Sequence, residues 1–131
     1  MRDIQKIVRS FLYAFKGLRH AYVKDKSFRM EIHYGFPLFL LGAWLLAPLA
    51  PWELLFYTFS YLLILLVELV NTAFETMLDK LHPEQHDVIG RSKDIASAAV
   101  FMAFVILVIV FVVLAYPRFF PETVSITHMF A

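Results

Sequence analysis

A ladder of polar side chains follows an apolar run near the middle of the chain and could carry out chemistry at the edge of a membrane. Its members are Glu68, Asn71, Thr72, Glu75 and Asp79. Because they are separated by three or four residues, they lie along one face of a helix. Ionisable groups in a spanning segment are costly and indicate a functional site that faces protein or water. Two carboxylates and an amide on such a face can accept a proton or bind a hard cation.

A second polar cluster, Arg91-Ser92-Lys93-Asp94, opens the next apolar run after a turn at His82-Pro83. The turn brings this cluster to the same surface as the ladder. Carboxylates that bind magnesium and an ammonium group that binds phosphate are what a magnesium–nucleotide complex requires. The simpler interpretation is that these groups only mark the solvated helix ends. It suits Asp79 and Lys80 well, and it suits Glu68 least, because Glu68 directly follows the apolar residues 62–67.

Other familiar sites are absent from the sequence. The four glycines, at positions 17, 35, 42 and 90, form neither GxxxxGK[ST] nor GxGxxG. There is no HExxH, and the five histidines are not spaced as a helical zinc pair. The chain has no cysteine, which excludes disulfide and thiol chemistry. Nothing in the sequence indicates a nucleic acid partner.

The composition places the chain among integral membrane proteins. Hydrophobic residues make up 60% of its 131 residues, and its mean hydropathy is +0.68. Soluble domains contain roughly 45–50% apolar residues. At this length a single domain, residues 1–131, is expected.

The elements that must position the polar groups are all helical. Residues 1–30 are predicted to form an amphipathic surface helix followed by a charged, solvated connection over residues 22–31. On its own pattern, this surface helix could be no more than an anchor. Three transmembrane helices are predicted over residues 33–51, 53–79 and 93–117, with a tail over residues 118–131. His33 and Tyr34 are expected at one membrane interface and Trp52 at the other.

Charge predicts the orientation of these spans. Most of the twelve Lys and Arg residues lie at or before Arg29, and three of the others lie between Lys80 and Lys93. The positive-inside rule therefore places the N-terminus and the polar ladder in the cytoplasm, where ATP is available, and the C-terminus in the periplasm. The expected location is a bacterial inner membrane.

At this point the sequence resembles a known family. The run Glu68-Leu-Val-Asn71-Thr-Ala-Phe-Glu75-Thr-Met-Leu-Asp79 is similar to the signature of the small prokaryotic diacylglycerol kinases, a family that includes undecaprenol kinases. The resemblance continues through Gly90-Arg-Ser-Lys93-Asp94 and, upstream, through Lys16-Gly-Leu-Arg19 and Phe28-Arg-Met-Glu31. It implies a homotrimer in which each chain has a surface helix and three membrane helices. The active sites, between subunits, transfer the γ-phosphate of ATP to a lipid hydroxyl.

The resemblance also implies roles for individual residues. Glu68 matches the general base, and Asp25 and Glu75 match the ligands of the magnesium ion that accompanies ATP. The positions matched to ATP binding are Lys6, Tyr13, Asp25, Glu75, Glu84, His86, Lys93 and Asp94. Those matched to the lipid substrate are Lys16, Arg19, Phe28, Arg29, Glu31, Glu68, Asn71 and Ser97.

Three positions depart from the family pattern. Asp25 stands where a Glu is usual, and its shorter side chain reaches less far toward a metal. Lys6 stands where an Arg is usual and lacks the bidentate geometry that suits phosphate. Tyr116 stands in place of a tryptophan, a mild change.

The sequence therefore predicts a lipid kinase that phosphorylates diacylglycerol to phosphatidic acid. Undecaprenol is the alternative acceptor. A small ion-coupled transporter subunit is the alternative from another class, with Glu68 and Glu75 as cation sites. It requires matching polar groups on a second spanning helix, where only Ser97 is available. A pure assembly factor leaves Glu68 unexplained.

Overall fold

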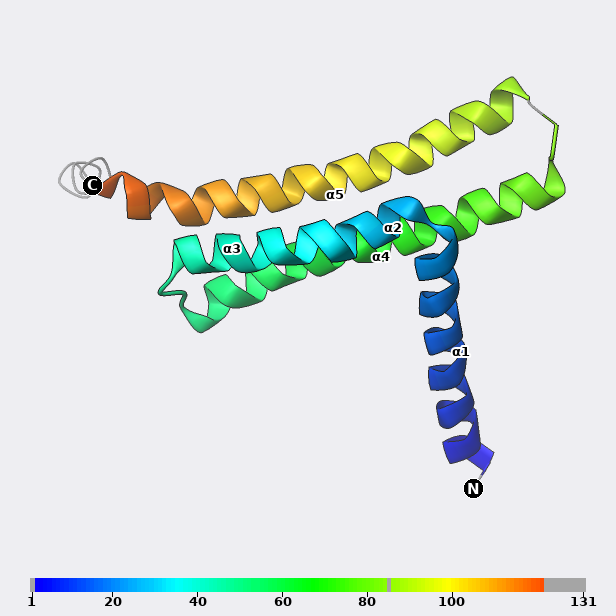
Figure 1. Cartoon of the computed structure of the whole chain (residues 1–131), viewed down its shortest axis with the longest axis horizontal. Helices are drawn as coiled ribbons and strands as arrows, with labels where there is room; N and C mark the ends of the chain where they lie inside the picture. Colours follow the sequence, from blue (N-terminus) through cyan, green and yellow to red (C-terminus); the bar gives the residue numbers. More distant parts are fainter. Residues whose placement is uncertain (1, 85, 122–131) are drawn as a thin grey trace.

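The computed structural model describes residues 2–84 and 86–121, and every regular element within them is helical (Figure 1). The elements in chain order are α1 (Arg2–Lys24), α2 (Lys26–Met30), the π-helical η1 (Glu31–Gly35), α3 (Phe36–Leu46), α4 (Pro51–Leu81) and α5 (Asp87–Phe119). The prediction of an all-α chain is confirmed for this part of the sequence.

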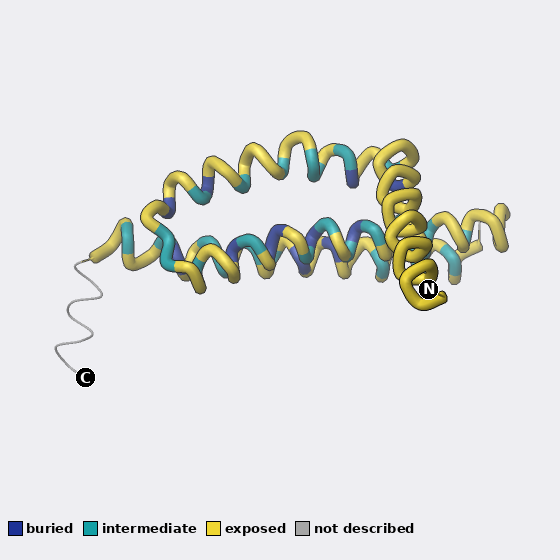
Figure 2. Tube along the Cα trace, turned by 90° about the horizontal axis from the view of Figure 1, so that it is seen from below, coloured by how far each residue is buried: buried dark blue, intermediate teal, exposed yellow. Residues whose placement is uncertain are grey.

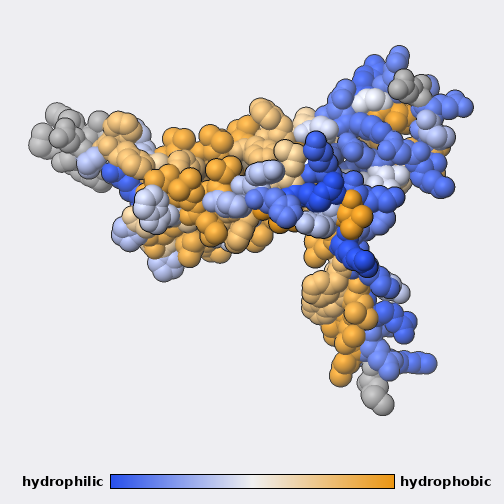
Figure 3. All heavy atoms as spheres, in the orientation of Figure 1, coloured by the Kyte–Doolittle hydropathy of each residue, from blue (hydrophilic) through white to orange (hydrophobic). Residues whose placement is uncertain are grey.

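The first helix, α1, projects away from the other helices (Figure 1). Its apolar side chains lie along one side and its hydrophilic side chains along the other (Figure 3). Ala21 is its only buried residue. The apolar side of α1 is turned toward the long apolar surface of the other helices (Figure 3). The hydrophilic end of α4 and α5 lies on the opposite side of α1. This arrangement suits a helix that lies in a membrane interface.

The charged connection predicted over residues 22–31 is itself helical, because the chain forms a helix again from Lys26. Asp25 ends α1 and serves as the N-cap of α2, where its Oδ1 accepts a hydrogen bond of 2.8 Å from the Ser27 amide. Phe28 in the following turn is buried. A capping carboxylate satisfies an otherwise free helix amide, so a stretch rich in charge can still begin a helix.

The remaining helices run alongside one another (Figures 1 and 2). The segments α2, η1 and α3 follow one another without a break and lie along α4, and α5 returns along α4. With 31 and 33 residues, α4 and α5 are long and apolar enough to cross a membrane. With 11 residues, α3 is too short to span alone. The first predicted span therefore depends on the helical turns that precede α3.

Aromatic rings hold α3 against α4. Phe39 stacks on Tyr57 at a centroid distance of 4.7 Å and on Tyr61 at 5.1 Å. The Tyr57 hydroxyl donates a hydrogen bond to the Phe39 carbonyl. It fits there because residue 42 is glycine: a Cβ atom at this position would overlap the hydroxyl. The packing fixes α4, and with it the polar ladder, relative to the chain that leads up to α3.

A closed polar network joins the opposite end of the helices. Glu53 accepts a hydrogen bond of 2.8 Å from the Ala50 amide at the start of α4. Arg118, in the last turn of α5, donates to the same Glu53 oxygen at 2.7 Å and to the Pro48 carbonyl at 3.0 Å. Most of the predicted tail, residues 122–131, lies outside the described residues.

Candidate active site

The polar ladder on α4 is packed inside the chain at its first two positions. Glu68 is only 4% exposed and Asn71 only 9%. A frayed, solvated helix end would expose both. The simpler interpretation of the ladder therefore fails for Glu68, and a buried carboxylate next to a buried amide requires a specific purpose.

Asp25 reaches the ladder from the junction of α1 and α2. Its Oδ2 accepts a hydrogen bond from the Thr72 hydroxyl, which also lies 2.9 Å from the Glu68 carbonyl oxygen. The turn that redirects the chain at Asp25 thus brings this carboxylate next to α4. Asp25 and Thr72 are 47 positions apart in the sequence.

A cavity of about 290 Å³ lies where these groups meet. Its walls come from α2, η1, α4 and α5, and its lining residues are Asp25, Ser27, Glu31, Glu68, Asn71, Glu75, Ser97, Val100 and Phe104. Four carboxylates share this small volume, and α5 contributes one hydroxyl and two apolar side chains. The cavity therefore provides acceptors and negative charge, and none of the described residues in its wall is a lysine or an arginine.

Several polar atoms in this cavity have unused hydrogen-bonding capacity. Within the described chain, Glu31 Oε2 and Asn71 Oδ1 are buried without a hydrogen-bond partner. The Asn71 amide nitrogen lies 3.5 Å from Glu75 Oε1, a long contact. Such a cluster is poised to receive a ligand that supplies donors or positive charge.

The carboxylates fit a magnesium ion that arrives with a nucleotide. In the described part of the chain, no three His, Asp or Glu side chains are grouped so that they could hold a metal ion unaided. Magnesium, however, is commonly bound through one or two carboxylates together with phosphate oxygens and water. Asp25 and Glu75 line the same cavity and provide such a pair.

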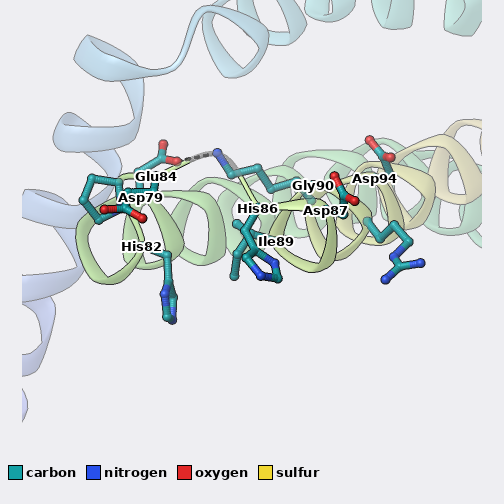
Figure 4. A pocket seen from close by; sticks show the side chains of 11 residues that line it. Asp79, His82, Glu84, His86, Asp87, Ile89, Gly90 and Asp94 are labelled. Atoms are coloured by element: carbon teal, nitrogen blue, oxygen red, sulfur yellow. Dashed lines mark hydrogen bonds and ion pairs between the residues drawn. The ribbon is translucent and has the colours of Figure 1, made fainter.

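A second cavity, of about 920 Å³, lies at the turn between α4 and α5 (Figure 4). It is lined by Asp79, His82, Pro83, Glu84, His86, Asp87, Ile89, Gly90, Arg91, Lys93 and Asp94. Four of the positions matched to ATP, Glu84, His86, Lys93 and Asp94, are thus brought together. His86 also begins α5, because its Nδ1 accepts a hydrogen bond of 3.3 Å from the Val88 amide.

Lys93 is held by an ion pair with Asp79, drawn as a dashed line in Figure 4. The side chain of Asp79 is 64% exposed and that of Lys93 33% exposed. Asp79 ends the ladder and Lys93 belongs to the second polar cluster, so this contact joins the two. It places an ammonium group in the wall of the larger cavity, which also contains several carboxylates.

The residues on α1 lie apart from these two cavities. Lys6 and Tyr13, both exposed, line neither of them, and α1 projects away from the α4–α5 turn (Figure 1). Lys16 lies with its ammonium group 5.6 Å from the centre of the Tyr13 ring. Lys16 also lines an apolar groove of about 1270 Å³ between α1 and α4.

The remaining substrate positions occupy varied surroundings. Arg19 is exposed on α1, and Phe28 is only 3% exposed. Arg29 donates from Nη1 to the Tyr22 and Val23 carbonyls at the end of α1. Glu31 and Ser97, in contrast, line the small cavity with Glu68.

Sequence reasoning missed several parts of the site. Ser27, Val100 and Phe104 line the small cavity, and no motif singles them out. Thr72 was visible as a ladder member, but its bond to Asp25 depends on the turn between α1 and α2. Asp79, interpreted as a marker of the water line, is the partner of Lys93. The spacing of four residues between Glu75 and Asp79 indicated that Asp79 continues the ladder, but it did not indicate the contact with Lys93.

Comparison with known proteins shows which family the sequence resembles. The family model described as prokaryotic diacylglycerol kinase matches residues 12–115, which include both cavities. The diacylglycerol kinase of Escherichia coli (strain K12) is 32% identical over 114 residues, covering 87% of this chain and 92% of that protein. The diacylglycerol kinase of Haemophilus influenzae is 35% identical over 108 residues, covering 79% of this chain and 86% of that protein. A diacylglycerol kinase of Helicobacter pylori is 26% identical over 98 residues, or 75% of each chain.

Proposed function

Because the chain belongs to the prokaryotic diacylglycerol kinase family and is a membrane lipid kinase, we propose that it transfers the γ-phosphate of ATP to the hydroxyl of diacylglycerol. The products are phosphatidic acid and ADP. The observation that carries the proposal is the buried carboxylate of Glu68 in a cavity shared with Asp25, Glu75 and Asn71.

Glu68 is the proposed general base. A lipid hydroxyl must lose its proton as its oxygen attacks the γ-phosphorus, and a carboxylate oxygen of Glu68 accepts that proton. The bond from phosphorus to the bridging oxygen breaks, and ADP leaves with the electron pair. Asn71, one turn further along α4, has a free amide oxygen that can orient the hydroxyl. Ser97 and Glu31 complete the wall around the acceptor.

Asp25 and Glu75 are the proposed ligands of the magnesium ion bound to ATP. The ion, when bound, offsets the negative charge of the phosphates. Asp25 accepts hydrogen bonds on both oxygens, from Ser27 and Thr72, which hold its carboxylate toward the cavity. Asp25 reaches less far than the usual Glu, but these two hydrogen bonds hold its carboxylate in a fixed position at the N-terminus of α2.

The larger cavity at the α4–α5 turn is the proposed nucleotide site. Glu84 and His86 contact the nucleoside, Lys93 contacts the phosphates, and Asp94 lies beside Lys93. Lys6 and Tyr13 do not line this cavity, and they belong to α1, which projects away from the α4–α5 turn (Figure 1). We therefore expect them to contribute to the site of a neighbouring copy, as a homotrimer with active sites between subunits requires.

The acceptor is proposed to enter from the lipid beside α1. The groove between α1 and α4 is lined by Leu18, Ala21, Leu69 and Met77, and Lys16 lies at its edge. Arg19, Phe28 and Arg29 belong to the same corner of the molecule. Diacylglycerol is preferred to undecaprenol because the relatives named above, matched over most of the chain, are diacylglycerol kinases.

The proposed orientation places the N-terminus and both cavities on the cytoplasmic side of the bacterial inner membrane and the C-terminus in the periplasm. The apolar side of α1 and the hydrophilic end of α4 and α5 support an interface at the level of α1 (Figure 3). A reporter fused after residue 131 tests the orientation. Activity of a cytoplasm-specific reporter there would contradict it.

The proposed reaction is tested with purified protein, radiolabelled ATP and magnesium in mixed micelles that contain diacylglycerol or undecaprenol. We expect label in phosphatidic acid with diacylglycerol. Glu68→Gln should lower turnover by roughly 100-fold or more, because the proton acceptor is lost, while binding of magnesium–ATP persists. Loss of ATP binding would make Glu68 a nucleotide ligand instead. Faster transfer to undecaprenol than to diacylglycerol would overturn the choice of acceptor.

A further inference from the structure

Two buried tyrosines continue the buried face of α4 from the polar ladder toward the start of the helix. Tyr61 lies seven residues before Glu68 and Tyr57 lies four residues before Tyr61, so all three share one face. A buried tyrosine hydroxyl usually needs a hydrogen-bond partner. Each hydroxyl donates to a backbone carbonyl of the helices facing α4: Tyr57 to Phe39 at 3.1 Å, and Tyr61 to Glu31 at 2.9 Å.

The two carbonyls belong to residues with different surroundings. Phe39 lies within α3 and stacks on the tyrosine rings, and it is not part of the cavity that contains Glu68. Glu31 begins the π-helical turn η1, and its side chain lines that cavity. Its Oε2 is buried without a hydrogen-bond partner in the described chain. The hydroxyl of Tyr61 therefore holds the backbone of a residue in the active site, although Tyr61 does not line the cavity itself.

The ring of Tyr61 is fixed from two sides. It stacks on Phe39 at a centroid distance of 5.1 Å. On its other side the turn η1 approaches closely, because residue 35 is glycine. A Cβ atom at position 35 would lie 3.3 Å from Tyr61 Cε2, which would push the ring away from the turn. Single π-helical turns are rare and are frequent at functional sites. Here the turn carries Glu31 and is held by the tyrosine.

We propose that Tyr61 is a positioning residue for the lipid acceptor. Its hydroxyl fixes the backbone at Glu31, so that the Glu31 carboxylate stays in the cavity that it shares with Glu68. The inference rests on the proposed function, in which Glu31 belongs to the wall around the acceptor. The proposed nucleotide site lies at the α4–α5 turn and does not include Tyr61 or Glu31. Tyr61 should therefore influence binding of diacylglycerol and not binding of ATP.

The test measures two KM values of the purified full-length enzyme in mixed micelles. The KM for diacylglycerol, as its mole fraction in the micelle, is determined at saturating ATP, and the KM for ATP at saturating diacylglycerol. Tyr61→Phe removes only the hydroxyl. Tyr57→Phe is the matched control, because it removes a hydroxyl that makes the same kind of bond from the same face of α4. The thermal midpoint in detergent is recorded for every variant.

We expect the KM for diacylglycerol to rise about fivefold in Tyr61→Phe, since loss of one hydrogen bond commonly changes an equilibrium by about that factor. The KM for ATP should not change. Tyr57→Phe should lower the thermal midpoint about as much as Tyr61→Phe and leave both KM values unchanged. A purely structural role for Tyr61 predicts no difference between the two variants in the KM for diacylglycerol.

A double-mutant cycle shows whether Tyr61 acts through Glu31. Once Glu31→Gln has altered the positioned group, adding Tyr61→Phe should raise the KM for diacylglycerol no further. An additional fivefold rise in this background would overturn the proposal, as would an unchanged KM in Tyr61→Phe alone or an equal rise in Tyr57→Phe. Failure of the wild type to phosphorylate diacylglycerol is a distinct result, which would overturn the proposed function together with this inference.

Discussion

The two ends of α4 carry their charges in opposite ways. At the first turn, Glu53 is matched to Arg118, and backbone groups of residues 48, 50 and 114 make further hydrogen bonds to this pair. Further along, Glu68 and Asn71 are buried near Asp25 and Glu75. Among the described residues, no lysine or arginine lines this cavity, and the Asn71 amide oxygen has no partner. In the first cluster, the opposite charges neutralise each other within the chain. In the second cluster, the carboxylates and the amide oxygen gain partners only when a ligand binds.

This difference separates a structural ion pair from a site. A matched pair contributes to holding helices together and offers nothing to a ligand. Uncompensated carboxylates cost stability in the absence of a ligand, and such a cost is typical of functional positions. The comparison therefore predicts that substitutions at one end change activity with little effect on folding, and that substitutions at the other end do the reverse.

The largest contrast is expected between Glu75→Gln and Glu53→Gln. Glu75→Gln should reduce turnover by roughly 1,000-fold at any magnesium concentration, because a ligand of the metal is lost. Glu53→Gln should leave turnover close to that of the wild type. Steady-state assays of both variants over a magnesium titration make the comparison. Full activity of Glu75→Gln would refute its assignment.

Asp25 should show an intermediate effect. Asp25→Asn removes a charge from the cavity but keeps an oxygen ligand, so we expect the magnesium concentration for half-maximal activity to rise about tenfold. Asp25→Glu should retain activity, since Glu is usual at this position in the family. It should also lower the thermal midpoint slightly, because Glu is a poorer N-cap than Asp. An unchanged magnesium requirement in Asp25→Asn would exclude Asp25 as a ligand.

Arg118→Gln tests the end of α4 at which Glu53 pairs with Arg118. The variant loses the ion pair to Glu53 and weakens the contacts to the Leu114 and Pro48 carbonyls. We expect the thermal midpoint in detergent to fall by a few degrees while kcat and the KM for ATP stay unchanged. A large change in the KM for ATP with no change in midpoint would contradict the division between the two ends.

The smallest effect is expected for Asp79→Asn. The ion pair with Lys93 is exposed to solvent, and such pairs contribute little. Releasing Lys93 should therefore change the KM for ATP by only about two- to threefold and leave kcat unchanged. Combining Asp79→Asn with Lys93→Met shows whether the two act together. Strict additivity of the two changes would mean that the contact plays no part in nucleotide binding.

Much of this molecule could be predicted from local patterns in the sequence. Helical periodicity predicted the amphipathic nature of α1, and the three-to-four spacing predicted that Glu68, Asn71 and Glu75 share a face. The location of Glu68 after an apolar run predicted that it is more than a solvated helix end. Each of these inferences depends on neighbours within a few turns of one helix.

The parts that could not be predicted depend on contacts between distant residues. The stretch around Asp25 reads as a solvated connection because charge alone is visible, whereas its cap and its bond to Thr72 require the folded chain. Arg118 reads as a lone cation in a tail, and its partner Glu53 lies 65 positions away. The π-helical turn at residues 31–35 has no sequence signal that we recognise.

Gly42 and Tyr57 have a consequence for how this sequence can vary. A side chain at position 42 would overlap the Tyr57 hydroxyl, and the nearest remaining contacts, to Tyr57 Cζ at 3.2 Å and Phe111 Cε2 at 3.3 Å, are tight but can relax. Alanine at 42 is therefore harmful beside tyrosine and tolerable beside phenylalanine at 57. The two positions are therefore coupled: enlarging residue 42 costs least after the hydroxyl at 57 has been lost, and the reverse order passes through a destabilised intermediate.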